Sequence, residues 1–331
     1  MVRPIGRPVG HLAAHQLDVA AQGVELVGVA QRHDDAAHAL VGTGTMTRSL
    51  AGLRRLTGGT MPKWSPAFPR PVRFSAPPVR PSTARDRVVY FPSCAARNMG
   101  AQRGDDDTEP LPATAARLFD KAGFDVVYPA GMDGLCCGQP FESKGLMQAA
   151  DAKSAELEAA LRDASGDGRL PIVFDTSPCA YRMRRFLAGP LEVRDSIDFV
   201  RDPVLPAVVI DRVSGPVAVH PVCSVRKMGL ADALVDVVRA CSDQVVTVDA
   251  VQCCGFAGEK GFTRPELNEH ALRHLKASLP AGCVLGYASS RTCEIGLSEQ
   301  AGFAYRSYLK LVDRCARPAL PMPIAPGPHD A

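Results

Sequence analysis

The segment FDVVYPAGMDGLCCG, residues 124–138, carries an apolar run into two adjacent cysteines and a glycine. The chain repeats this order in DQVVTVDAVQCCG, residues 243–255. Each copy is typical of a short β-strand, rich in β-branched residues, that leads into the cysteine pair. The glycine after each pair allows the tight backbone turn that would face both sulfurs inward. Two such copies predict that one structural unit has been duplicated.

Single cysteines flank each pair, so both halves of the chain carry the order C … CCG … C. The two sets are Cys94, Cys136, Cys137 and Cys179 in the first half and Cys223, Cys253, Cys254 and Cys293 in the second. Each single cysteine and each pair follows a predicted strand. Ligands of open α/β sheets bind beyond the carboxyl ends of the strands. We therefore expect four thiols to converge in one crevice in each half.

Four thiolates in one place repel each other unless a positive centre lies between them. Iron–sulfur clusters and zinc are the centres that select thiolate ligands. A vicinal disulfide or a catalytic dithiol at each pair is the alternative interpretation. The cysteines outside the repeat are predicted to be small buried residues; they are Cys241, Cys283 and Cys315.

Predicted strands alternate with predicted helices through the body of the chain, which indicates an α/β fold with mostly parallel sheets. We expect two duplicated Rossmann-like units, preceded by a helical segment and a proline-rich arm whose Trp64 anchors it to the body. The expected boundaries are 1–61 for the helical segment, 62–85 for the arm, 86–210 and 211–317 for the two units, and 318–331 for a disordered tail. Helices are predicted within them over residues 11–22, 46–56, 265–279 and 305–315.

The composition excludes several classes of protein. The chain has 331 residues and a net charge of +3, with 11 cysteines. No basic run with interleaved aromatics suggests nucleic-acid binding, and no apolar stretch approaches the roughly 20 residues that span a bilayer. The start lacks the apolar core of a secretory signal. We expect a cytoplasmic protein with metal or redox cysteines, which could contact a membrane partner peripherally on the inner face of the membrane.

Several longer segments carry a resemblance to a known family; they are MPKWSPAFPRP (61–71), HPVCSVRKMGL (220–230), CCGFAGEKGFTRPELN (253–268), GYASSRTCEIGLS (286–298) and YRSYLKLVDRC (305–315). They resemble the C-terminal cysteine-rich (CCG) domain pair of FAD-linked D-lactate dehydrogenases of the cytochrome or quinone type, and the arm before it. The resemblance runs from about residue 40 to residue 316. Related domain pairs occur in the cysteine-rich subunit of heterodisulfide reductase and in the iron–sulfur subunits of glycolate and glycerol-3-phosphate oxidation.

The resemblance implies that each cysteine set ligates one iron–sulfur centre. In the heterodisulfide reductase branch the motif ends in C-x-x-C, which supplies a fifth cysteine. Here Thr176 and Ser290 stand at that position. This difference favours a conventional four-thiolate 4Fe-4S cluster in each half, and zinc in one half is the alternative.

The dehydrogenases of this family also contain a flavin domain and a ferredoxin-like segment. The chain shows no glycine-rich flavin-binding stretch before residue 86 and no C-x-x-C-x-x-C-x-x-x-C-P run. FAD and the substrate-oxidising residues are therefore expected on a partner domain or subunit, and no catalytic residue is assigned in this chain.

The function that we expect is electron transfer from that flavin to a quinone or cytochrome acceptor during oxidation of a D-2-hydroxy acid of the D-lactate type. Two alternatives remain open at this point. One is thiol or heterodisulfide redox chemistry at the paired cysteines. The other is a zinc-stapled docking scaffold for the flavoprotein.

Polar residues close to the predicted ligands are candidates for tuning the centres; they are His220, Glu142, Glu259, Lys260 and Arg291. For each of them, an ordinary solvated or structural role is the competing interpretation. Asp175 is expected to cap the turn around Cys179.

Overall fold

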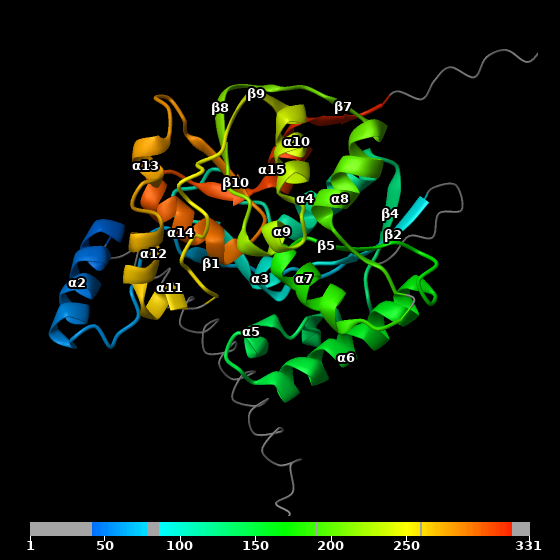
Figure 1. The fold of residues 1–331 in the computed structure, drawn as a ribbon, viewed down its shortest axis with the longest axis horizontal. Coiled ribbons are helices and arrows are strands. Elements are labelled where there is room, and N and C mark those ends of the chain that lie inside the picture. The colour runs from blue at the N-terminus through cyan, green and yellow to red at the C-terminus, as the bar shows by residue number, and fades with distance from the viewer. Residues whose placement is uncertain (1–41, 78–85, 190, 259, 320–331) are drawn as a thin grey trace, which may run out of the picture.

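The computed structural model describes residues 42–77, 86–189, 191–258 and 260–319 (Figure 1). The predicted helix over 11–22, the candidate tuning residue Glu259 and all but the first residues of the predicted tail lie outside these ranges. The predicted helix over 46–56 is present as the longer helix α2 (Thr43–Leu56).

The first unit contains a parallel four-stranded sheet in the order β4-β2-β5-β6. Its strands are β2 (Asp86–Phe91), β4 (Phe124–Val127), β5 (Ile172–Phe174) and β6 (Val193–Asp195). In β2, Val88 and Tyr90 pack into one apolar cluster while Val89 and Phe91 pack into another. Successive side chains of a strand point to opposite faces, so this uninterrupted apolar run is buried on both sides of the sheet.

The second unit repeats this arrangement in a parallel sheet with the order β11-β10-β8-β9. Its strands are β8 (Val213–Val219), β9 (Ser242–Val246), β10 (Leu285–Ala288) and β11 (Tyr305–Ser307). In each sheet the first strand of the unit lies between the second and third strands in sequence. The predicted α/β fold with two parallel sheets is confirmed.

Helices cover both faces of the sheets. Those of the first unit are α3 (Cys94–Asn98), α4 (Leu111–Lys121), α5 (Gln139–Glu142), α6 (Met147–Ser165), α7 (Ser177–Phe186) and α8 (Ser196–Phe199), with the short turns η1 (Met132–Gly134), η2 (Val200–Val204) and η3 (Leu205–Ala207). Those of the second are α9 (Cys223–Lys227), α10 (Ala231–Cys241), α11 (Lys260–Thr263), α12 (Pro265–Ala271), α13 (Leu275–Ser278), α14 (Arg291–Ala301) and α15 (Tyr308–Cys315).

The two units share one apolar core. Helix α15 packs on α4, and α10 packs on α15 and α8, so helices from both units meet in the upper part of the view in Figure 1. Buried side chains from β2 and α4 belong to the same apolar cluster as those from β8, α10 and α15. The opposite face of the first sheet is covered by α6 and α7 around a separate cluster.

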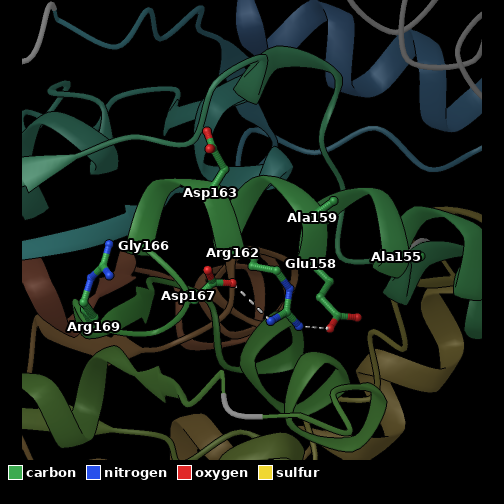
Figure 2. Close-up of a pocket in the computed structure, with 8 residues that line it drawn as sticks. All are labelled: Ala155, Glu158, Ala159, Arg162, Asp163, Gly166, Asp167 and Arg169. Atoms are coloured by element: carbon green, nitrogen blue, oxygen red, sulfur yellow. Dashed lines mark hydrogen bonds and ion pairs between the residues drawn. The ribbon is translucent and has the colours of Figure 1, made fainter.

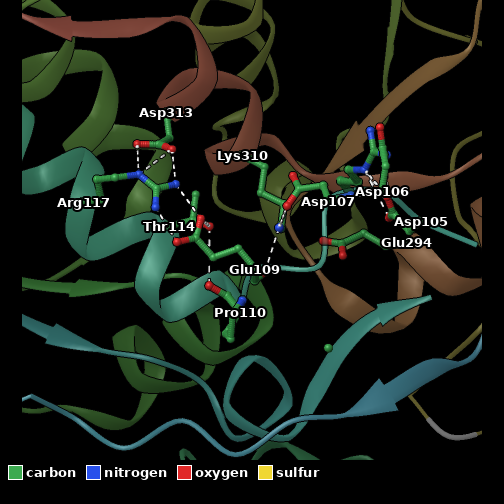
Figure 3. Close-up of polar contacts among 12 residues, drawn as sticks. Asp105, Asp106, Asp107, Glu109, Pro110, Thr114, Arg117, Glu294, Lys310 and Asp313 are labelled. Atoms are coloured by element: carbon green, nitrogen blue, oxygen red, sulfur yellow. Dashed lines mark hydrogen bonds and ion pairs between the residues drawn. The ribbon is translucent and has the colours of Figure 1, made fainter. Parts of the chain in front are cut away.

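Ion pairs also join the units beside this core (Figure 3). The Asp105 carboxylate accepts hydrogen bonds from Arg306 Nε at 3.0 and 3.2 Å. Arg117 of α4 binds Asp313 of α15 through Nε, at 3.1 Å to Oδ2. Lys310 pairs with Asp107. The loop before α4 is thereby held against the second unit.

Two small antiparallel pairs complete the fold. Strand β1 (Pro69–Pro71), in the proline-rich arm, pairs with β3 (Met99–Gln102), and β7 (Val208–Ile210) pairs with β12 (Ala316–Pro318). The arm also reaches the second unit, because the Lys63 amide donates to the Phe262 carbonyl at 2.6 Å. Trp64 on this arm is half-buried.

The structure differs from the predicted helices in two places. Strand β11 precedes α15, so the segment over 305–315 is a strand followed by a helix; the Ser307 hydroxyl accepts from the Leu309 amide and starts the helix there. The helix predicted over 265–279 is divided into α12 and α13. None of the helices in the described ranges has the length and apolar character that crossing a bilayer requires.

Candidate functional site

The two single cysteines that open each set begin short helices at the carboxyl ends of equivalent strands. Cys94 is the first residue of α3, just beyond β2, and Cys223 is the first residue of α9, just beyond β8. The chain moves from β2 and β8 first to one neighbouring strand and later to the other. Crevices for ligands form at such switch points. Both cysteines therefore lie where an open α/β sheet binds its ligand.

The single cysteines that close each set lie in the first turns of longer helices. Cys179 is in α7, which follows β5, and Cys293 is in α14, which follows β10. Thr176 and Ser290 are the N-cap residues of these helices. Both cysteines therefore lie at the N-terminal end of a helix, where the backbone N–H groups favour a bound anion.

The cysteine pairs lie in loops with the same local geometry. The Gly138 amide approaches Cys136 Sγ at 3.4 Å, and the Gly255 amide approaches Cys253 Sγ at 3.4 Å. Both glycines have a positive φ, of 84° and 68°. A Cβ atom on Gly138 would overlap the carbonyl oxygen of Ala150, and one on Gly255 would overlap that of Leu267. Only glycine fits this turn against the following helix.

The thiols of each set contact one another in the same order. In the first set, which we call the first thiol cluster, Cys94 is hydrogen-bonded to Cys136, Cys136 to Cys137, and Cys137 to Cys179. The second thiol cluster repeats the order as Cys223, Cys253, Cys254 and Cys293. Cys254 Sγ and Cys293 Sγ are 3.0 Å apart. The structure thus brings together all eight predicted cysteines, four in each unit.

The first cysteine of each pair is the preferred thiolate. Hydrogen bonds from Cys137 and Cys94 lower the pKa of Cys136 to about 3. Hydrogen bonds from Cys223 and Cys254 lower the pKa of Cys253 to about 2. The pKa of each neighbouring thiol that donates to them is raised in turn, as for Cys94. Each cluster therefore holds a thiolate between thiols that can still lose protons to a positive centre.

These donor sets fit a thiolate-bound centre by their chemistry. Among the described residues, no three or more His, Cys, Asp or Glu side chains are arranged to hold one metal ion. Sulfurs around a single tetrahedral zinc lie roughly 3.8 Å apart for Zn–S bonds of about 2.3 Å. The 3.0 Å contact of Cys254 with Cys293 is shorter. Binding of zinc or of a larger iron–sulfur cluster requires these thiols to move apart.

Two buried polar residues that the sequence did not single out hold the pairs in place. Ser154 Oγ of α6 donates to the Cys137 carbonyl at 2.9 Å, and Asn268 Nδ2 of α12 donates to the Cys254 carbonyl at 2.6 Å. The only signal in the sequence is a polar residue on the helix that follows each pair. Arg97 adds a bond from Nη2 to the Leu135 carbonyl at 2.7 Å, which fixes the loop that leads into the first pair.

The predicted tuning residues have different surroundings. His220 is buried beside the second thiol cluster, and its Nε2 has no hydrogen-bond partner among the described residues. Glu142 forms an ion pair with Arg185 at 3.1 Å, and Lys260 is exposed at the start of α11. Arg291 binds Glu294 at 3.1 Å and the Gly100 carbonyl of the first unit. Arg291 therefore joins the two units.

Asp175 is buried beside the first thiol cluster. Its carboxylate accepts hydrogen bonds from the Tyr90 hydroxyl at 2.8 Å, the Ser93 amide at 3.0 Å and the Thr176 hydroxyl at 2.9 Å. The residue therefore ties the turn before Cys94 to the turn before Cys179, and does not serve the second turn alone.

A seam joins the two units at the turns that lead to Cys179 and Cys293. The Ser177 amide donates to the Ser289 carbonyl at 3.1 Å, and the two hydroxyls are 2.9 Å apart. Helix α7, which carries Cys179, packs against α9, which starts with Cys223. A surface hollow along α6 lies elsewhere and is lined by charged residues such as Glu158 and Arg162; no cysteine lines it (Figure 2).

The sequence of the first unit matches the model of a known protein family. Residues 88–184 match the family model of the CCG cysteine-rich domain. The matched range runs from β2 to α7 and contains the whole first thiol cluster.

Curated relatives add a distant homology over more of the chain. They are subunits of the anaerobic glycerol-3-phosphate dehydrogenases of Escherichia coli K12 and O157:H7, each 26% identical over 222 residues, 62% of this chain and 52% of the relative. The chain thus spans about half the length of the curated relatives it matches. An aspartate racemase homologue from Pyrococcus horikoshii OT3 aligns with 69% of this chain and 96% of its own, at 9% identity and a TM-score of 0.27, a likeness too low to bear on function.

Proposed function

We propose that this chain is an electron-transfer component of a flavin-dependent dehydrogenase and holds one 4Fe-4S centre in each unit. The ligands are the four cysteines of the first thiol cluster and the four of the second thiol cluster. The observation that carries the proposal is the repeated order of thiol contacts at the switch points of two equivalent sheets. Homology to a component of the anaerobic glycerol-3-phosphate dehydrogenase supports the same class of role.

A centre of this kind, when bound, accepts and releases single electrons. The residues of the chain orient its thiolates and exclude water from part of it. Cys137 and Cys254 are buried, and Cys179 and Cys293 are held in the first turns of α7 and α14. The seam at Ser177 and Ser289 brings the two thiol-bearing ends of the units together.

The flavin and the substrate site belong, in this proposal, to a partner domain or subunit, and a quinone or cytochrome chain accepts the electrons. The finer proposal for the substrate is a D-2-hydroxy acid such as D-lactate, on the resemblance of the second unit. Glycerol 3-phosphate is the second candidate, because that substrate is in the name of the curated relatives.

Anaerobic reconstitution of the chain with iron and sulfide tests the class of function. The proposal predicts the broad visible absorption of iron–sulfur centres and an EPR signal after reduction. A chain that takes up zinc stoichiometrically and gives no such signal would instead be a zinc-stapled scaffold.

The electron donor that reduces the centres then tests which partner and which substrate the chain serves. The reconstituted chain is mixed with a D-lactate-oxidising flavoprotein and D-lactate, or with a glycerol-3-phosphate-oxidising flavoprotein and its substrate. Reduction of the centres by only one of the two systems assigns the substrate class. If neither system reduces the centres but a disulfide substrate changes their spectrum, the heterodisulfide alternative replaces the proposal.

A further inference from the structure

The two units have different residues at an equivalent position close to the thiols. The last residue before the Pro-x-Cys turn is Phe91 in the first unit and His220 in the second. Phe91 is fully buried and packs on Phe174 with ring centroids 5.1 Å apart. The first unit therefore has an apolar ring where the second has an imidazole.

His220 has an unsatisfied nitrogen in a dry location. Its side chain is 5% exposed, and Nε2 has no hydrogen-bond partner among the described residues. The backbone amide of His220 donates to the Tyr287 carbonyl at 2.9 Å, which fixes the residue at the carboxyl end of the sheet. A buried polar atom without a partner destabilises the folded state, because it has lost its hydrogen bonds to water. Such an atom needs an explanation, and a bound group beside it supplies one.

One of the groups that interact with His220 belongs to the second thiol cluster. His220 and Cys253 interact electrostatically, and each affects the pKa of the other. An imidazole carries at least one N–H donor in either of its protonation states, so His220 can donate to a group bound beside it.

We propose that His220 donates a hydrogen bond from Nε2 to a sulfur atom of the second centre and so raises its reduction potential above that of the first. This inference rests on the proposed function. A hydrogen bond to a cluster sulfur stabilises the more negative, reduced state, and hydrogen bonding and solvent exposure are both established determinants of cluster potential.

A difference in exposure acts in the same direction. Cys253 is exposed, whereas its counterpart Cys136 is half-buried. Solvent exposure is one of the determinants of cluster potential.

The test is an EPR-monitored redox titration of the reconstituted full chain. The double variant Cys136→Ala/Cys137→Ala retains the second centre alone, and Cys253→Ala/Cys254→Ala retains the first, so each potential is assigned. We expect the second centre to have the higher midpoint potential. His220→Phe, which copies the first unit, is expected to lower that potential, and His220→Gln, which keeps an N–H donor, is expected to restore most of it. His270→Phe on the exposed side of α12 is the matched control and should change neither potential.

Labelling the histidines with ¹⁵N gives a second readout. This readout does not require that the phenyl ring of His220→Phe fits into the space of the imidazole. A nitrogen hyperfine coupling to the reduced second centre, absent in His220→Gln, supports the proposal. The inference is overturned by equal potentials in wild type and His220→Phe, by equal losses in His220→Phe and His220→Gln, or by the absence of a nitrogen coupling. In those cases the proposed function still stands. A wild-type chain that binds no iron–sulfur centre would contradict both the inference about His220 and the proposed function.

Discussion

Gly138 and Gly255 determine whether the cysteine pairs can lie against the helices that follow them. The duplicated CCG motif pointed to these glycines, and the sequence predicted that each one allows a tight backbone turn. The structure adds a second reason, since each glycine also touches a helix carbonyl. Ser154 and Asn268, which bind the carbonyls of the pairs, were not predicted. Their role depends on where α6 and α12 pack, and local sequence does not specify that.

Gly138→Ala is expected to destabilise the first unit by more than about 1 kcal/mol, because the positive φ strains any side chain and the Cβ overlaps Ala150. Urea unfolding measures the change. Gly134→Ala in the same loop is the matched control, since Gly134 has neither a positive φ nor an atom within 4 Å of a Cβ. Equal effects of the two substitutions would show that the turn at Gly138 is not required.

Asp195 gives the molecule a specific dependence on pH. It is fully buried at the start of α8, where its carboxylate accepts from the Ile197 amide at 2.9 Å, and burial raises its pKa from 3.8 to about 6. A raised acid pKa stabilises the folded state below pH 3.8, and this contribution is lost as pH rises through 6. The amount is about 3 kcal/mol for a shift of this size.

Asp195→Asn keeps the cap and removes the titration. The stability of the wild type relative to Asp195→Asn should therefore fall between about pH 4 and pH 6, as measured by chemical denaturation at each pH. A difference that stays constant over this interval would mean that the pKa of Asp195 is close to its usual value.

At the scale of elements, the alternation of strands and helices was predictable because apolar runs and amphipathic stretches have different periods. Strand β11 was missed because it is three residues long and continues directly into α15. Its counterpart β6 was predicted, so the internal repeat itself was the signal that could have identified it. The pairing of β1 with β3 joins an arm to a unit through backbone bonds, which side-chain patterns do not report.

The ion pairs between the units hold α15 and the loop before α4 together. Asp105→Asn removes a largely buried partner of Arg306 and should cost about 2 kcal/mol in the free energy of unfolding. Asp243→Asn breaks the exposed pair with Arg212 and should cost less than about 0.5 kcal/mol. Thermal or urea unfolding compares the two. Similar small effects would show that the contact at Asp105 adds little to the interface.

On the scale of the whole molecule, duplication explains both the fold and the clusters. Two sheets with the same strand order present their thiols at equivalent switch points, and helices from both units close over one shared core. The convergence of the cysteines was predictable from their repeated order and from the predicted strand before each of them. The seam between Ser177 and Ser289 was not, because it depends on how the two units dock.

The central claim is that each unit holds its own four-thiolate iron–sulfur centre. The most direct test is quantification of iron and acid-labile sulfide in the reconstituted chain and in the variants Cys136→Ala/Cys137→Ala and Cys253→Ala/Cys254→Ala. The account predicts about eight iron and eight sulfide atoms per wild-type chain and about half of that in each variant. Zinc without sulfide in the wild type, or iron content that neither variant reduces, would contradict it.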